Sequence, residues 1–176
     1  MASRIEVDSM GEVEVPEDAL YGAQTQRALN HARIAPQRTM PPPFVYALAL
    51  LKAAAAIANA RVGALDVHLA EAIASAAGAV AAGRHDGAFP VPVFQTGSGT
   101  SSNMNMNEVL ARLASTAAGQ PVHPNDHVNC SQSSNDVVPS AIALAAACEL
   151  RNILGPAISA LEDALRGRAG ELESVV

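Results

Sequence analysis

A repeat of apolar residues with a helical period constrains the fold of this chain more than any other feature. One set recurs at spacings of three, four and seven, at Phe44, Leu48, Leu51, Ala58 and Val62. A second set follows at Leu65, Leu69, Ile73, Ala76 and Val80. Each spacing describes one face of a helix. Gly63 and Gly83 stand where helix ends are expected. The pattern predicts two antiparallel helices with a short connection.

Alanine supplies much of the apolar content, and this favours a helical core. Hydrophobic residues make up 49% of the chain and aromatic residues only 3%. Alanine has the highest helix propensity and is poor in strands. A third helix is expected after the loop at residues 96–102, and its buried side is predicted to hold Met106, Val109, Leu110, Leu113 and Ala117. The fold class is therefore mainly α.

The last forty residues continue the helical pattern across a proline. A narrow stripe of large apolar residues, called the leucine stripe below, consists of Leu150, Leu154, Ile158, Leu161 and Leu165. It keeps its phase across Gly155 and Pro156, so we expect a kinked long helix or two coaxial helices. A narrow, long stripe is typical of a bundle seam. We predict a small mixed amino-terminal domain at 1–136, with an extended piece near 10–16, and the beginning of a long, truncated helical bundle at 137–176.

Charge and cysteine content exclude several protein classes. The net charge is -6, Lys52 is the only lysine, and the ten arginines are scattered, so a nucleic-acid partner is not expected. A membrane span is not expected either, because no apolar run reaches the length needed to cross a bilayer, and the longest candidate, 44–60, contains Lys52 and Asn59. A secretory signal is not expected, because the first residues include Arg4, Glu6 and Asp8 and no apolar segment. Cys130 and Cys148 lack disulfide-framework or metal-ligand spacing, which predicts a reduced cytoplasmic protein.

The stretch QTGSGTSSNMNMNE, residues 95–108, has the composition of an anion site. Its glycines allow a tight turn and a close approach to a ligand. The helix that follows directs its unpaired N–H groups at this hydroxyl-rich loop, which suits a carboxylate or a phosphate. A plain glycine turn capped by serine is the alternative interpretation. Thr100, Asn103 and Asn107 share one helix face, which predicts a polar cavity, with a solvent-facing stripe as the alternative.

The stretch HPNDHVNCSQSSND, residues 123–136, permits two further interpretations. His123 and His127 could suggest a metal pair, but Pro124 disfavours a helix there and no third ligand is evident, so no metal site is predicted. The run 133–136 offers N-cap residues for the last helix. It either caps that helix only or forms a second anion-binding helix start, aimed at the other end of a dicarboxylate. No lysine lies near either stretch in the sequence, and Arg112 is alone, so a dianion needs a cation from elsewhere.

These two stretches resemble the fumarase and aspartase superfamily, and class II fumarases most closely. QTGSGTSSNMNMNEV at 95–109 is similar to the fumarase version, whereas aspartases typically carry Gly-Gly-Ala-Gly-Thr where this chain reads Thr-Gly-Ser-Gly-Thr. HPNDHVN, SQSSND and the amino-terminal YGAQTQRA at 21–28 fit the same family. The resemblance covers nearly the whole chain.

The resemblance implies specific site residues. Substrate carboxylate would be bound by Ser98, Gly99, Thr100, Ser133, Ser134 and Asn135. A second dicarboxylate site would consist of His123, Pro124, Asn125 and Asp126. The family has an arginine three residues before that histidine, where this chain has Gln120, so the resemblance implies weaker binding at the second site. The ligands would be malate and fumarate, without a metal or an organic cofactor.

The resemblance also implies a mechanism that this chain does not complete. The family reversibly eliminates water from malate, in the tricarboxylic acid cycle, with active sites built from three subunits of a homotetramer. Its catalytic serine lies on a Gly-Ser-Ser-x-Met-Pro-x-Lys loop, and a Thr-His pair contributes; the 176 residues contain neither motif and no catalytic residue. We expect an inactive amino-terminal part. The alternatives are another superfamily lyase such as aspartase, and a non-catalytic helical assembly module.

Overall fold

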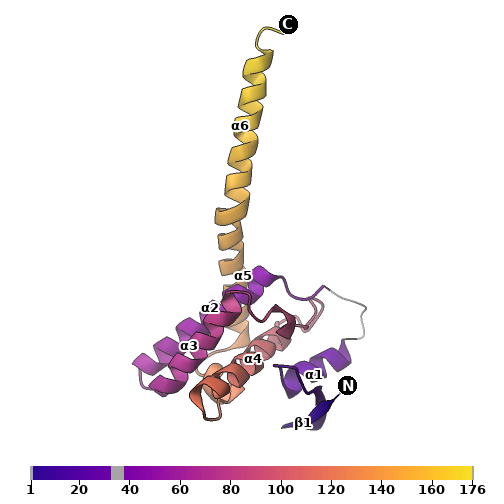
Figure 1. Cartoon of the computed structure of the whole chain (residues 1–176), viewed down its shortest axis with the longest axis vertical. Coiled ribbons are helices and arrows are strands. Elements are labelled where there is room, and N and C mark those ends of the chain that lie inside the picture. The colour runs from indigo at the N-terminus through magenta and orange to yellow at the C-terminus, as the bar shows by residue number, and fades with distance from the viewer. Residues whose placement is uncertain (1, 33–37, 176) are drawn as a thin grey trace.

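The computed structural model of this chain describes residues 2–32 and 38–175, and most of them are helical (Figure 1). In chain order the elements are β1 (Ser3–Asp8), β2 (Gly11–Pro16), α1 (Ala23–His31), α2 (Pro42–Arg61), α3 (Val67–Ala81), η1 (Asp86–Ala88), α4 (Thr100–Ala118), η2 (Pro124–Val128), α5 (Ser134–Glu149), η3 (Leu150–Leu154) and α6 (Gly155–Leu172). The predicted class, mainly α with a small mixed amino-terminal part, is confirmed. The division into domains at 136 and 137 stays a prediction.

The amino-terminal part is an antiparallel hairpin followed by a short helix. β1 pairs with β2 from Ser3 opposite Pro16 to Asp8 opposite Gly11. Gly11 has φ 105, a left-handed value that glycine adopts without strain. The expected extended piece near 10–16 is β2, whereas β1 and α1 were not predicted. Glu108 on α4 accepts hydrogen bonds from the first turn of α1, which fixes the amino-terminal part to the helical core.

The core lies between α2, α3, α4 and the first half of α5. The predicted buried face of α3 is confirmed, since Leu65, Leu69, Ile73, Ala76 and Val80 are all buried. Gly63 and Gly83, both with φ 75, follow the ends of α2 and α3 as expected. α4 buries Met106, Val109 and Leu110. Leu113 is only half-buried and Ala117 is exposed, and Ala114 is buried in their place.

The buried face of α2 differs from the prediction in its second half. Phe44 and Leu48 are buried as predicted, but Ala58 is exposed and Val62 is 78% exposed. The buried face continues instead through Lys52 and Ala56 to Asn59. The prediction followed only apolar residues, and two of the buried positions are polar.

Two helical stretches of the described chain, Pro42–Arg61 and Ser134–Leu172, are long and apolar enough to cross a bilayer by length and composition alone. The expectation that no run reaches that length is therefore wrong. The core helix of a soluble protein passes the same test, and α2 is packed in this way against α3, α4 and α5. It also carries Lys52 on its buried side. The length criterion thus gives no support for a membrane span in α2.

Two π-helical turns appear where prolines occur. Pro124 opens η2, a five-residue π turn, so the expectation that Pro124 disfavours a helix there is wrong. A proline at the first helical position loses only an N–H that has no helical partner. α5, η3 and α6 follow one another as a single rod that projects from the core (Figure 1). The π turn η3 directly precedes Gly155 and Pro156 and absorbs the missing backbone donor of the proline. The expectation of coaxial helices is met.

Candidate functional site

The beginning of α4 presents free backbone donors next to hydroxyl groups. Gly99, the residue before the helix, has φ 68 and no side chain with which to cap the helix. The Oγ of Ser98 lies 2.9 Å from Oγ1 of Thr100. Gln95 accepts a hydrogen bond from the Ser102 amide at 2.9 Å, whereas the amides of Thr100 and Ser101 have no acceptor among residues 2–32 and 38–175. Such a helix start carries a partial positive charge and free donors, which suit an anion.

The beginning of α5 is capped by a serine. The Ser133 side chain accepts a hydrogen bond from the Asn135 amide at 3.3 Å, which confirms the predicted N-cap. The loop before it includes Ser131, with φ 58, the one non-glycine residue with positive φ in the described part of the chain. Backbone strain of this kind persists only where surrounding contacts enforce it.

The structure brings these two helix starts together. The Asn103 Nδ2 on α4 donates to Oγ of Ser134 on α5 at 2.9 Å. At Gly99, an added Cβ would lie 2.7 Å from Cγ1 of Val138. Of the six predicted substrate residues, Ser98, Thr100, Ser133 and Asn135 are exposed, and Gly99 and Ser134 are half-buried. We call these six residues the paired helix starts; their role in substrate binding stays a prediction.

A buried polar cluster lies beneath the paired helix starts. Nζ of Lys52 donates to Oδ1 of Asn129 at 3.0 Å and to Oε1 of Gln132 at 2.9 Å. Nδ2 of Asn103 and Nδ2 of Asn107 each lie 3.2 Å from the same Asn129 oxygen. We call these five residues the amide cluster. The predicted polar face of α4 is thus buried rather than solvent-facing at Asn103 and Asn107, whereas Thr100 is exposed.

The amide cluster corrects the expectation that no lysine lies near these stretches. Lys52 is fully buried, and its ammonium group contacts the loop between the two predicted sites. Burial lowers the pKa of Lys52 to about 7. No carboxylate of the described chain lies within 4.0 Å of it. Oδ1 of Asn103 and Oδ1 of Asn107 are buried without a partner in this part of the chain, so the cluster retains free acceptors.

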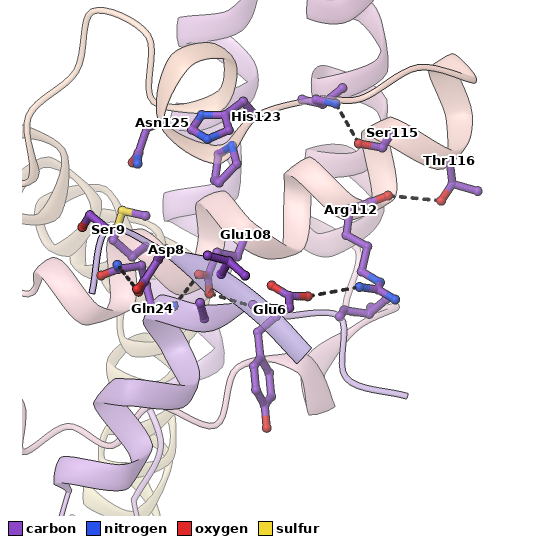
Figure 2. A pocket seen from close by; sticks show the side chains of 18 residues that line it. Glu6, Asp8, Ser9, Gln24, Glu108, Arg112, Ser115, Thr116, His123 and Asn125 are labelled. Carbon is purple, nitrogen blue, oxygen red and sulfur yellow. Dashed lines mark hydrogen bonds and ion pairs between the residues drawn. The ribbon is translucent and has the colours of Figure 1, made fainter. Parts of the chain in front are cut away.

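Three of the four residues predicted for the second site line a cavity of about 660 Å³. His123, Pro124 and Asn125 form part of its wall; Asp126 does not. Figure 2 shows His123 and Asn125 on one side, with Glu6, Asp8, Gln24 and Arg112 on other sides. These residues come from the hairpin, α1, α4 and η2, so the cavity joins the amino-terminal part to the core. Its role as a ligand site stays a prediction.

The cavity contains charges of both signs. Glu6, Asp8 and Glu108 contribute carboxylates. Arg112 Nη1 lies 3.5 Å from Oε1 of Glu6. The neighbouring Arg27 hydrogen-bonds Asp8, and this contact holds the pKa of the Asp8 carboxyl below its ordinary value. Arg27 does not line the cavity, so Arg112 is the arginine that contributes a guanidinium group to its wall.

His123, which precedes η2, and His127, which lies within it, both form hydrogen bonds with the local backbone. Nδ1 of His127 accepts from the His123 amide at 2.9 Å. Nδ1 of His123 lies 3.1 Å from both the amide nitrogen and Oδ2 of Asp126, so a neutral ring accepts from the amide and a protonated ring pairs with the carboxylate. Within residues 2–32 and 38–175, no group of three or more His, Cys, Asp or Glu side chains could hold a metal ion.

Sequence reasoning missed Lys52, Asn129 and Gln132. The signal for Lys52 was its spacing, because it follows Phe44 and Leu48 at intervals of four on the buried face. No comparable signal marked Asn129, whose partners are 77, 26 and 22 positions away.

Comparison with known proteins adds independent evidence. The sequence profile described as "Lyase" matches residues 11–176. The class II fumarate hydratase of Xylella fastidiosa is 55% identical over 173 residues, covering 98% of this chain and 36% of the relative. A class II fumarate hydratase of Pseudomonas aeruginosa is 55% identical over 174 residues, covering 99% of this chain and 38% of the relative.

Solved structures give the same picture. A class II fumarase from Schistosoma mansoni superimposes with a TM-score of 0.92 and 41% identity, covering 97% of this chain and 37% of the other. A fumarate lyase:delta crystallin from Brucella melitensis has a TM-score of 0.93 and 40% identity, covering 99% and 42%. The chain thus spans little more than a third of the length of these relatives.

Proposed function

This chain belongs to the lyase family, and from that premise we propose that it is the substrate-binding amino-terminal part of a class II fumarate hydratase. The whole enzyme would interconvert fumarate and L-malate in the tricarboxylic acid cycle, as a cytoplasmic homotetramer. The observation that carries the proposal is the contact of Asn103 with Ser134, which places two helix starts side by side. The free amides at the start of α4, together with the polar side chains of Ser133, Ser134 and Asn135 at the start of α5, suit the two carboxylates of one small ligand.

The paired helix starts would stabilise the negative charge that develops on a substrate carboxylate during the reaction. In the elimination, a base removes the proton from the carbon beside one carboxylate, and the electron pair moves into that carboxylate. The C–O bond on the adjacent carbon then breaks, and a general acid protonates the departing hydroxide to give water. The amides of Thr100 and Ser101 and the hydroxyl of Ser98 would stabilise the extra negative charge, which is usually the largest catalytic contribution. The base and the acid lie outside these 176 residues, so we propose that the chain alone is inactive.

Two assays test this proposal. The 176-residue chain, and the product of its coding DNA read beyond Val176, are each supplied with L-malate and with L-aspartate. We expect fumarate from malate with the longer product only, and a loss of about 10–100-fold in its kcat/KM on Ser98→Ala, since a hydrogen bond to a charged group is lost. Activity of the short chain would contradict its incompleteness. Fumarate from aspartate instead would identify an aspartase, and a stop codon directly after Val176 would favour the assembly module.

We propose that His123, Pro124, Asn125 and Asp126 form a second dicarboxylate site, with the first three on the wall of the cavity of Figure 2 and Asp126 just outside it. Arg112 supports this proposal, because it supplies a cation on the wall although position 120 is glutamine. Titration with succinate, followed by NMR at the His123 ring, tests it: we expect a shift that Arg112→Gln abolishes and that Gln120→Ala leaves unchanged. An unperturbed His123 signal would contradict the second site.

The proposed oligomer is supported by the leucine stripe. Its residues are 48% to 61% exposed in this chain, and large apolar side chains in such a row are typical of an interface.

A further inference from the structure

Two polar side chains on the buried face of α2 hold the loop before α5 by three hydrogen bonds. Nζ of Lys52 donates to Oδ1 of Asn129 and Oε1 of Gln132. About two turns further along the same helix, Nδ2 of Asn59 donates to the carbonyl oxygen of Cys130 at 2.9 Å. The loop runs directly into Ser133, the N-cap of α5. The position of the second helix start is therefore tied to the side chains of α2.

The link continues from Lys52 to the first helix start. Oδ1 of Asn129 accepts from Lys52 and also from Asn103, and Asn103 donates in turn to Oγ of Ser134. Lys52 thus lies two hydrogen-bonded residues away from Ser134. Because no described carboxylate pairs with Lys52, the positive charge beneath the paired helix starts has only neutral amide oxygens as partners.

We propose that Lys52 is a positioning residue for the paired helix starts: it fixes the loop from Asn129 to Gln132 and supplies the buried positive charge that favours a dianionic ligand. This rests on the proposed function for the identity of the ligand, a small dicarboxylate. The strained Ser131, with φ 58, lies between the two residues that Lys52 holds, as expected if these contacts enforce the loop conformation. The unpartnered oxygens of Asn103 and Asn107 mark the same cluster as incomplete without further donors.

The first test needs no ligand. Lys52→Met keeps an unbranched chain of similar length but removes the charge and the donors, and Asn129→Ala removes the same link from the loop side. We expect amide exchange of Gln132, whose N–H bonds the Asn129 carbonyl oxygen at 3.1 Å, to accelerate about tenfold or more in both variants. Exchange in the middle of α3, at Ile73 and Ala77, should change less than about threefold.

Ile73→Val serves as the matched control. It removes one methylene group from a fully buried position on α3 and loosens the core without touching the loop. We expect Ile73→Val to accelerate amide exchange at Ala77 and to leave the amide exchange rate of Gln132 unchanged. If Lys52→Met and Ile73→Val give the same pattern, or if Gln132 is unaffected, the positioning role is overturned. Should Lys52→Met not fold, Asn129→Ala decides the question by the same measurement.

The second test separates charge from shape. Succinate, a dianion, and succinamate, a monoanion of similar size, are titrated at about pH 6, below the pKa of about 7 of Lys52. We expect Lys52→Met to reduce the preference for succinate about tenfold or more, whereas a merely structural role would weaken both ligands alike. Equal weakening overturns the charge role. If neither ligand binds the unaltered chain while Gln132 exchange still responds to Lys52→Met, the proposed ligand-binding function fails and the positioning of the loop stands.

Discussion

The hydroxyl of Thr25 donates a hydrogen bond of 2.6 Å to Oε2 of Glu108, across 83 positions of sequence. The same carboxylate accepts from the amides of Gly22, Gln24 and Thr25 at 3.0, 2.7 and 3.1 Å. α1 has no capping side chain of its own, so a residue of α4 satisfies its first turn. At Gly22 an added Cβ would lie 2.6 Å from Oε2 of Glu6, so a larger residue there would require the Glu6 side chain to move.

Glu108→Gln should release the amino-terminal part from the core. The amide has one oxygen in place of two and turns its NH₂ group toward backbone donors, so we expect a loss of about 2–4 kcal/mol in the free energy of unfolding. Urea denaturation followed by circular dichroism measures it. Glu12→Gln, a similar change at an exposed hairpin position, is the control and should stay within about 0.5 kcal/mol. Equal effects of the two variants would show that Glu108 does not anchor α1.

Gly99→Ala should separate the paired helix starts. Alanine there meets a left-handed backbone with φ 68 and a Val138 methyl group at 2.7 Å, so we expect a loss of about 2–4 kcal/mol. Gly119→Ala isolates the backbone effect, because Gly119 has φ 65 and nothing within 4 Å of its Cβ position, and should cost about 1 kcal/mol. Gly97→Ala has neither problem. Thermal unfolding of the three variants would refute the explanation if Gly99→Ala cost no more than Gly119→Ala.

Stability should rise with pH above neutrality because of Lys52. Its pKa of about 7 in the folded chain lies below the ordinary 10.5, so the unfolded chain binds more protons between these values. The free energy of unfolding should therefore increase from about pH 7 to about pH 9, by about 1 kcal/mol per pH unit. Chemical denaturation at several pH values tests this, and Lys52→Met should remove the slope. A slope that persists in Lys52→Met would assign it to another group.

The leucine stripe should govern self-association and contribute little to the stability of the chain itself. Ile158 and Leu161 are 56% and 59% exposed, so replacing both by lysine should change the stability of the unassociated chain by less than about 1 kcal/mol. The same double variant should sediment as a smaller species than the parent chain. Asp163→Lys adds a lysine to an exposed position of α6 and should leave association intact. Unchanged sedimentation of the double variant would exclude the stripe as an interface.

Periodicity identified elements whose buried residues are apolar, and it failed where buried residues are polar. The α3 face from Leu69 to Val80 follows directly from its spacing, because each buried position is occupied by an apolar residue. On α2 the buried face predicted from periodicity differs from the observed one after Leu48. There Lys52 and Asn59 occupy buried positions, and their partners lie more than 70 residues away in the sequence. Such distant partners cannot be predicted from the residues that neighbour Lys52 and Asn59 in the sequence.

The candidate site divides in the same way. The two helix starts were predicted from glycine, serine and asparagine content, because these residues act on their own backbone. Their approach through Asn103 and Ser134 depends on how α4 packs on α5, which only the structure shows. The π turn at Pro124 was missed because proline was weighed as a helix breaker, whereas it opens the turn.

The rod formed by η3 and α6 bears on how long a chain like this would survive in a cell. None of its residues from 150 to 172 is buried in this chain, and a helix without tertiary contacts is only marginally stable in water. In an unassociated copy this helical segment would therefore unfold often, and the unfolded segment would be accessible to proteases. A partner on the leucine stripe would suppress that opening by mass action. Copies produced in excess of their partners would be degraded first, so assembly would adjust abundance through turnover.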